Sequence, residues 1–303
     1  MTKILLTGAL GSPFPYLADS LMGLGYEIIY VDSAAKEGMC IRKVRLIGKG
    51  YFEDVKKIIK EEKPDFYVPL IDEEITWACM VHDKTICPTK DFCKACLNKE
   101  DLMQYLRDLK ISVVKTWVGD RSAIDKYPVE YPCIVKPVTG RGSRGVRKIF
   151  NKAQYLGYLV LECKQPLTVM RQEYLDGEEY TISVVVNNKN QLMSIVPKRI
   201  IEKRGITIRA VTEKNGAIHG VCEEIVNKMH PCGPFNVQLR VVDGVPKIFE
   251  INPRLSTTSI LTTEAGVNEI DLCIKYWDAD STPYFQFKEG LHIYRRWKSI
   301  FYE

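Results

Sequence analysis

The sequence contains no apolar run close to the ~20 residues that a membrane-spanning helix needs, and it begins without a secretory pattern, because Met1 to Lys3 leads directly into a short strand. It also lacks repeats, low-complexity segments and long linkers. The formal net charge is only +5 over 303 residues. Basic residues form no long stripe, which argues against a nucleic-acid track. We therefore expect a cytoplasmic protein that binds neither membranes nor nucleic acids.

Cysteine is frequent but irregularly spaced, with ten in the chain, so reduced thiols are expected in a cytoplasmic setting. Four of them cluster at Cys79, Cys87, Cys93 and Cys96. The Cys93-x-x-Cys96 pair suits one half of a zinc site. The spacings of the other two cysteines do not form a second pair, and the segment has a helical pattern, so zinc is the less favoured interpretation.

The N-terminal third has the pattern of an α/β layer. Strands at Lys3–Thr7 and Tyr26–Val31 enclose a helix at about Phe14–Gly25, which resembles the start of a dinucleotide-binding unit. The glycine pattern in Gly8–Ser12 is incomplete, so a redox cofactor is weakly supported there. We expect the loop to bind part of a small substrate or simply to turn.

A second feature of this layer is acidic. After a helix at about Tyr51–Glu62 and a strand at Asp65–Leu70, the sequence continues with Asp72, Glu73 and Glu74, at the start of a helix to about His82. Open parallel sheets place ligands at the carboxyl ends of their strands, but acidic residues also favour a helix N-terminus. The sequence leaves both interpretations open.

The pattern changes near residues 88–98, which is the best domain boundary. Beyond it we expect a helix at Leu97–Lys110 with Asn98 as its N-cap, then mostly short strands, further helices, and a C-terminal strand near Tyr294 that extends a sheet or supports a homodimer. The expected strands are Val113–Trp117, Cys133–Lys136, Arg144–Phe150, Thr168–Tyr174, Tyr180–Val186 and Ser194–Ile201. The expected helices are Lys152–Cys163, Lys214–Met229 and Glu264–Trp277.

Two late segments alternate polar and apolar residues, the period of strands with two different faces. Asn236 and Gln238 share a face with Arg240 in the first segment, and Glu250 and Asn252 share a face in the second. The apolar residues between them, including Phe249, are expected on the reverse face. Oxygen atoms of carboxylates and amides are ligands that Mg²⁺ prefers, usually together with nucleotide phosphates.

The pairing register decides whether these oxygens meet. Asp243-Gly244 is a strong hairpin signal, but a plain two-residue turn would pair Gln238 with Phe249 and divide the polar residues between two faces. A slip of one residue, through a three-residue loop or a bulge with a left-handed glycine, pairs Gln238 with Glu250 or Ile248. We predict the slipped register.

A glycine-rich loop follows a strand that ends at Lys136-Pro137. Three glycines, Gly140, Gly142 and Gly145, lie within six residues, together with Arg141 and Arg144. Such a loop lets backbone amides approach an anion closely, and Lys136 can reach the same phosphates. No Gly-Lys-Ser/Thr opens a helix here, so this is not a P-loop.

An acidic segment, Gln172 to Thr181, joins two later strands. An adenine ring needs an apolar slot with polar groups at its edge, and a carboxylate accepts ribose hydroxyls. Glu173 to Leu175 suit the slot and Glu179 the ribose. Alone this segment is weak evidence for nucleotide binding. The evidence is stronger because the segment lies between the lysine–glycine loop and the polar strands in the sequence.

Together these segments resemble the ATP-grasp superfamily, and within it the ATP-binding halves of the carbamoyl-phosphate synthase large subunit and similar stand-alone ligases. The motifs that carry the resemblance are Lys136-Pro137 with its glycine loop, Glu173-Tyr174-Leu175 with Glu179-Tyr180, Asn236-Val237-Gln238, and Glu250-Ile251-Asn252-Pro253-Arg254. The similarity covers about residues 95–260. It implies a Rossmann-like domain at residues 1–92 and an ATP-grasp domain at residues 93–303, with a mobile lid at about 112–173.

The resemblance also implies residue roles. ATP would be bound by Lys99, Lys136, Gly140, Gly142, Ser143, Gly145, Glu173, Tyr174, Leu175 and Glu179. One or two Mg²⁺ ions, which Mn²⁺ can replace, would be bound by Gln238, Glu250 and Asn252. Arg254, Arg199 and Lys136 would stabilise the transferring phosphoryl group. Gln238 stands where many relatives have a carboxylate, which leaves the number of ions uncertain.

The implied reaction is ATP-dependent activation of a small-molecule carboxylate as an acyl phosphate, which an amine or a thiol attacks. Two alternatives stay open at this point. One is a carbamoyl-phosphate-type kinase acting on bicarbonate or carbamate, although the chain has a single ATP unit and no glutaminase. The other is a nucleotide-binding regulatory protein without activity, against which the intact set of Lys136, Gln238, Glu250 and Asn252 argues.

Overall fold

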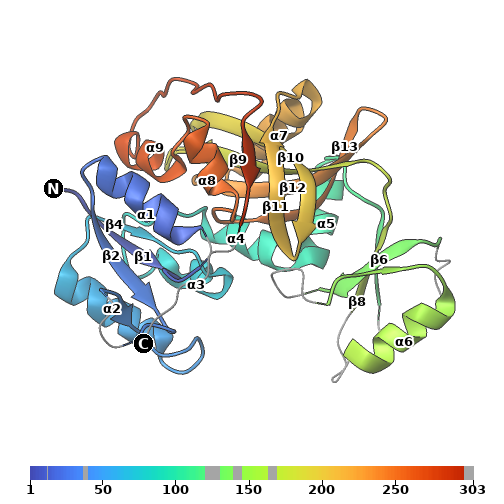
Figure 1. Cartoon of the computed structure of the whole chain (residues 1–303), viewed down its shortest axis with the longest axis horizontal. Coiled ribbons are helices and arrows are strands. Elements are labelled where there is room, and N and C mark those ends of the chain that lie inside the picture. Colours follow the sequence, from blue (N-terminus) through green and yellow to red (C-terminus); the bar gives the residue numbers. More distant parts are fainter. Residues whose placement is uncertain (12, 37–39, 120–129, 139–144, 163–168, 297–303) are drawn as a thin grey trace.

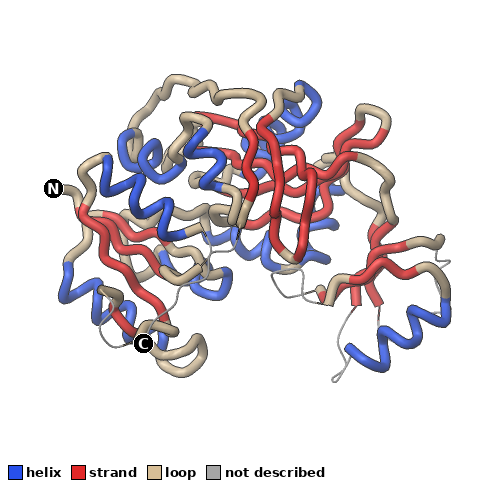
Figure 2. The backbone as a smooth tube through the Cα atoms, in the orientation of Figure 1, coloured by secondary structure: helices blue, strands red, loops and turns tan. Residues whose placement is uncertain are grey.

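The computed structural model of the chain describes residues 1–11, 13–36, 40–119, 130–138, 145–162 and 169–296. These residues form three sheets with helices packed around them (Figures 1 and 2). In Figure 1 an N-terminal unit lies on the left, a platform with the largest sheet lies in the centre, and a small unit lies on the right. The predicted mixed α/β fold is confirmed, with one parallel and two antiparallel sheets.

The N-terminal unit has a parallel sheet that is buried on both faces. Its strand order is β3 (Arg42–Lys43), β2 (Glu27–Asp32), β1 (Lys3–Thr7) and β4 (Phe66–Val68). Alternate residues of β1 supply the two faces: Ile4 and Leu6 pack with helix α1 (Phe14–Gly23), whereas Leu5 packs with helix α2 (Tyr51–Glu62). This two-sided burial is typical of parallel sheets, whose crossover helices cover both faces. Helix α3 (Asp72–Ala78) follows β4.

Helices α4 (Lys90–Leu97) and α5 (Lys99–Asp108) connect this unit to the rest of the chain. The predicted N-cap of α5 is confirmed, because the Asn98 side chain accepts from the amides of Glu100 at 3.0 Å and Asp101 at 3.3 Å. Helix α4 crosses the domain boundary predicted at residue 92, and that boundary stays a prediction.

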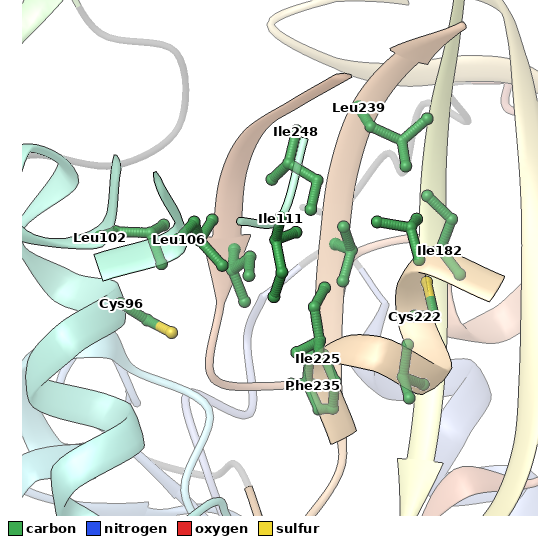
Figure 3. Close-up of a cluster of buried hydrophobic side chains, with 14 of the residues drawn as sticks. Cys96, Leu102, Leu106, Ile111, Ile182, Cys222, Ile225, Phe235, Leu239 and Ile248 are labelled. Carbon is green, nitrogen blue, oxygen red and sulfur yellow. The ribbon is translucent and has the colours of Figure 1, made fainter. Parts of the chain in front are cut away.

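The platform sheet has six strands in the order β13 (Val245–Asn252), β12 (Phe235–Val242), β9 (Glu178–Val186), β10 (Leu192–Arg204), β11 (Ile206–Thr212) and β14 (His292–Tyr294). One face is covered by α5 and by α7 (Gly216–Met229). There Leu102 and Leu106 of α5 and Ile225 of α7 pack with Leu239 and Ile248 of the sheet (Figure 3). This apolar face fixes which residues of β12 and β13 point to the opposite side.

The C-terminal helix was predicted wrongly as one segment, Glu264–Trp277. The chain forms two short helices, α8 (Ser259–Glu264) and α9 (Glu269–Lys275). Gly266 between them has φ +95°, which favours glycine, and the Asn268 side chain accepts from the Asp271 amide at 3.1 Å to start α9. Ile270 of α9 shares a buried cluster with Leu21 of α1, so the N-terminal unit packs against the platform.

The small unit, called the lid unit below after the predicted lid, has an antiparallel sheet of its own. Its order is β5 (Thr116–Gly119), β8 (Val169–Glu173), β6 (Cys133–Pro137) and β7 (Arg147–Ile149), with helix α6 (Lys152–Glu162) on one face. Val135, Ile149 and Leu159 belong to its separate core. Among the described helices of the whole chain, none combines the length and the apolar character needed to cross a membrane.

Candidate active site

A cavity of about 260 Å³ is lined by residues of both the platform and the lid unit. The platform supplies β9 to β13 and the chain after β13, the lid unit supplies β6 and β8, and α5 supplies Lys99. Most of the predicted site residues in the described part of the chain line this one cavity, namely Lys99, Lys136, Glu173, Tyr174, Leu175, Glu179, Gln238, Glu250, Asn252 and Arg254.

The predicted register of β12 and β13 is confirmed. Gln238 pairs with Glu250, and Asn236 pairs with Asn252, so the four polar side chains lie on the face opposite the apolar core. Asn236 is held further by the Thr181 hydroxyl, which donates to its Oδ1 at 2.7 Å. Oxygen atoms from two neighbouring strands are thereby gathered at the cavity wall.

The structural cause of this register differs from the prediction. Val242 pairs with Val245, so Asp243 and Gly244 do close a plain two-residue turn, and both have positive φ (49° and 77°). The slip lies further along, where Leu239 pairs with Ile248 and leaves one extra residue, Phe249, in β13. A bulge of this kind re-aims the side chains beside it.

Phe249 was therefore placed wrongly on the reverse face. It lines the cavity, and the Lys136 ammonium lies 5.6 Å from the centre of its ring. Lys136 also donates to the Phe249 carbonyl at 3.2 Å. The bulge thus adds an aromatic wall to the cavity next to the acidic Glu250.

Two lysines face the polar strands. Lys136 on β6 is only 4% exposed, and this burial lowers its pKa to about 8, with Glu250 opposing the shift. Lys99 lies at the start of α5, and its ammonium is 3.7 Å from Glu250 Oε1. Both amines lie near the one carboxylate of the polar strands, Glu250, a charge arrangement that suits a phosphate chain bound together with a cation.

The segment that joins β8 to β9 forms another wall. Glu173 Oε1 accepts from the Lys115 amide at 2.8 Å and lies 3.4 Å from the Lys247 ammonium. The Lys148 ammonium lies 3.3 Å from the centre of the Tyr174 ring. These contacts hold the segment with cations from both the lid unit and β13.

Only part of the glycine loop can be placed. Gly140, Gly142 and Ser143 lie outside the described residues. Gly145 has φ +70°, and a Cβ there would lie 3.1 Å from Pro137. Its carbonyl accepts from the Tyr158 hydroxyl at 2.8 Å. The end of the loop is therefore anchored beside Lys136, and its contact with a nucleotide stays a prediction.

Arg254 lies where the N-terminal unit meets the cavity. Its Nε and Nη2 donate to the Asp72 carboxylate, across 182 positions of sequence, and its Nη1 donates to the Leu255 carbonyl at 3.1 Å. Asp72 is thus an ion-pair partner at the cavity edge. Glu74 is different, because it is fully buried and accepts hydrogen bonds within its own unit. It therefore fits a structural role at the start of α3 better than a ligand-binding role.

Arg199 does not line the cavity. Its Nε is 2.7 Å from Glu213 Oε2 and 3.5 Å from Glu178 Oε1. It pairs in the sheet with Tyr180, whereas the neighbouring Lys198 pairs with the cavity residue Thr181. Because successive strand residues point to opposite faces, the geometry does not support a catalytic role for Arg199.

Lys198 itself is completely buried. Its ammonium donates to Ser183 Oγ at 2.6 Å and to Thr262 Oγ1 of α8 at 2.7 Å. Burial lowers its pKa to about 8, and the charge of Glu269 opposes the shift. The amine therefore links β9 to α8 beneath the chain that follows Arg254.

Lys198→Met should change how the stability of the protein depends on pH. The folded pKa of about 8 lies below the ordinary value of 10.5, so the unfolded chain binds more protons in this window, and the lysine makes stability rise with pH. As the pH rises from about 8 to the ordinary lysine value of 10.5, the free energy of unfolding of the wild type should increase by roughly 1–3 kcal/mol relative to that of the variant.

Urea denaturation at a series of pH values measures this difference, and Lys275→Met on the exposed side of α9 is the control. The prediction would be contradicted if the difference in free energy of unfolding between wild type and Lys198→Met stayed constant from neutral pH to the ordinary lysine pKa.

Two other sequence interpretations can be compared with the structure. Asp32, the last residue of β2, accepts from the amides of Leu10 at 2.9 Å and Ala34 at 2.8 Å, so both of its oxygens stabilise the local loops. Within the described residues no group of three or more cysteine, histidine or acidic side chains could hold a metal ion. Neither observation supports a redox cofactor or a zinc site.

A family model described as "ATP-grasp in the biosynthetic pathway with Ter operon" matches residues 165–296. This match confirms the predicted resemblance to the ATP-grasp superfamily. The chain is 30% identical over 156 residues to D-alanine–D-alanine ligase of Petrotoga mobilis, covering 46% of the chain and 52% of that enzyme. It is 24% identical over 193 residues to the arginine-specific carbamoyl phosphate synthase large chain of Geobacillus stearothermophilus, covering 59% and 18%.

A solved structure shares the overall fold. The L-amino acid ligase from Bacillus licheniformis superposes with a TM-score of 0.71 at 16% identity, covering 91% of this chain and 74% of the ligase. The chain spans about half the length of the D-alanine–D-alanine ligase and less than a fifth of the carbamoyl phosphate synthase that it matches.

Proposed function

We propose that this protein is an ATP-dependent ligase that activates a small-molecule carboxylate and transfers its acyl group to an amine or a thiol. The observation that carries the proposal is one cavity wall on which Gln238, Glu250 and Asn252 meet through a bulged register and face Lys99 and Lys136. Similarity to proteins named as D-alanine–D-alanine ligase and L-amino acid ligase supports carbon–nitrogen bond formation.

In this proposal the nucleotide lies between the lid unit and the platform. Ile134, Leu175 and Phe249 give the cavity apolar surface for the adenine ring, and the backbone near Glu173 and Tyr174 lies at its edge. Glu179 accepts the ribose hydroxyls. Lys99 and Lys136 bind the phosphates from two sides, and contact between the glycine loop and the phosphates stays a prediction.

The polar strands fit a magnesium ion by the chemistry of their donors. The set of Gln238, Glu250 and Asn252 offers two amide oxygens and one carboxylate, all hard ligands of the kind that Mg²⁺ and Mn²⁺ bind. Bound Mg²⁺ would neutralise charge on the phosphates during transfer. The single carboxylate, already near Lys99, supports one ion more strongly than two.

The chemistry proposed has two steps. A carboxylate oxygen of the substrate attacks the γ-phosphorus of ATP, and the bond to the bridging oxygen breaks, which releases ADP and gives an acyl phosphate. The amine or thiol then attacks the carbonyl carbon, and phosphate leaves. Lys136 and Arg254 stabilise the negative charge that develops, while closure of the lid unit would exclude water, which otherwise hydrolyses the acyl phosphate.

The substrate end of the cavity is defined by Arg254 and the hydroxyl residues that follow it. Ser256, Thr257 and Thr258 line the cavity, as do Ile200 and Ile206. Hydroxyls and a guanidinium suit a small carboxylate, with apolar surface for the rest of the molecule. A homodimer and the absence of nucleic-acid binding stay predictions.

One assay tests the proposed function. The protein is incubated with Mg-ATP and pools of carboxylates and amines, ADP release is followed, and hydroxylamine is added as a trap for acyl phosphates. A hydroxamate that forms only with an organic acid supports the ligase. ADP release with bicarbonate alone would indicate the carbamoyl-phosphate-type kinase instead, and no turnover with any pool would favour a nucleotide-binding regulatory protein.

A further inference from the structure

Arg240 binds the segment that joins the lid unit to the platform. It lies on β12, two residues beyond Gln238, and lines the cavity. Its Nη1 donates to the carbonyl of Gly177 at 2.9 Å and to that of Leu175 at 3.4 Å. Its Nη2 donates to Glu179 Oε2 at 2.7 Å. One guanidinium therefore bonds to two residues of this connecting segment and to Glu179 at the start of β9.

The segment also touches the platform directly at Gly177. A Cβ at this position would lie 2.2 Å from the carbonyl oxygen of Val241 and 2.8 Å from Val242. Only glycine lets the backbone come this close to the end of β12. The backbone of the connecting segment therefore packs directly against the end of β12. The Arg240 side chain, one residue earlier on the same strand, bonds to the same segment.

Glu179 is held by a second cation. The Lys203 ammonium of β10 lies 2.7 Å from its Oε1, while Arg240 takes Oε2. The carboxylate is 18% exposed and lines the cavity. Because each carboxylate oxygen accepts about two hydrogen bonds, each one keeps an acceptor position for a hydroxyl. Two cations on different oxygens fix the orientation of that pair of acceptors.

We propose that Arg240 is a positioning residue that makes the site selective for ribonucleotides. By holding Glu179 and the Leu175–Gly177 backbone together, it presents two aligned acceptors, which match the neighbouring 2′ and 3′ hydroxyls of a ribose and not the single hydroxyl of a 2′-deoxyribose. The inference rests on the proposed function, in which Glu179 faces the ribose of ATP. Without Arg240, Lys203 is the one remaining cation among the described residues that bonds to the carboxylate.

Nucleotide binding tests this without any acceptor substrate. We expect calorimetry to show that the wild type binds Mg-ATP more tightly than Mg-2′-deoxy-ATP. In Arg240→Met, ATP affinity should fall about 10–100-fold, the range for hydrogen bonds to charged groups. The affinity for 2′-deoxy-ATP should fall much less, so the preference for the ribonucleotide should nearly disappear.

The pattern separates positioning from simple loss of structure. A purely structural defect would weaken the binding of both nucleotides equally and leave the ratio of their affinities unchanged. Arg240→Lys keeps a cation near Glu179 but lacks the guanidinium that reaches the carbonyls of Leu175 and Gly177. It should therefore retain part of the preference for ATP over 2′-deoxy-ATP. The same variant provides the test if Arg240→Met does not fold. Arg107→Met is the matched control, since Arg107 is exposed on α5 and contacts Gln104.

The possible failures are distinguishable. If the wild type binds neither nucleotide, the proposed function fails. If the wild type binds ATP but does not distinguish it from 2′-deoxy-ATP, or if the Arg240 variants keep the wild-type ratio, ATP binding stands and the role assigned to Arg240 is overturned.

Discussion

Replacing Glu250 with alanine is expected to lower ATP turnover by about 10²–10³-fold, the usual cost of removing one preorganised group that stabilises transition-state charge. Glu250 is the one carboxylate in its set with Gln238 and Asn252, so without it the proposed cation site has only neutral donors. Its loss also removes the ion pair with Lys99. The side chains of Lys99 and Glu250 are 10% and 22% exposed, so the pair is mostly buried and its loss should lower stability as well.

The measurement is ADP release under the conditions of the ligase assay, with circular dichroism to confirm the fold. Glu250→Asp keeps the charge but shortens the side chain, so its turnover should lie between those of the wild type and Glu250→Ala. Glu224→Ala is the control, because Glu224 pairs with Lys228 on the exposed side of α7. Wild-type turnover in folded Glu250→Ala would refute the metal assignment.

The polar face of the β12–β13 hairpin could be predicted because alternation and residue type point to the same conclusion. Asn236, Gln238, Glu250 and Asn252 meet only if the register slips, and the chemistry required the slip. The place of the slip could not be predicted, because a bulge depends on packing of both strands with α5 and α7. As a result Phe249 was assigned to the apolar face, although the bulge turns it into the cavity.

Other differences come from long-range contacts that local patterns do not contain. Arg199 and Lys198 are neighbours in a basic stretch, and only the pairing of β10 with β9 decides which one lies on the cavity face. Arg240 was recognised as sharing the face of Gln238, but its bonds to Leu175 and Gly177 span more than sixty positions. The strand β11 was missed as well, since its partners β10 and β14 are what stabilise it.

Glu74→Ala is expected to lower the free energy of unfolding by roughly 3–5 kcal/mol, as when one member of a buried charged network is removed. Glu74 is completely buried, and burial raises its pKa while the surrounding donors lower it. Its two oxygens accept five hydrogen bonds, from the hydroxyls of Thr7, Tyr51 and Tyr67 and the amides of Leu70 and Ile71.

Alanine would leave all five donors without this acceptor in the interior, and each unsatisfied buried group costs about 1–3 kcal/mol before relaxation. Urea denaturation measures the loss, and Glu53→Ala, at an exposed position in the first turn of α2, is the control. Glu74→Gln keeps one acceptor oxygen but turns an amide donor toward the hydroxyls, so its loss should be smaller. A change below about 1 kcal/mol in Glu74→Ala would contradict the prediction, because that is the net value of a single ordinary hydrogen bond.

The same network bears on the active site through Asp72. Glu74 fixes the backbone of Leu70 and Ile71, which leads directly into Asp72, the partner of Arg254. In a Glu74→Ala protein that stays folded at low temperature, Arg254 should lose its fixed partner, and turnover should fall together with that of Asp72→Asn. If Asp72→Asn lowers turnover while Glu74→Ala does not, Arg254 rather than the buried carboxylate maintains the position of Asp72, and the N-terminal unit does not align Arg254.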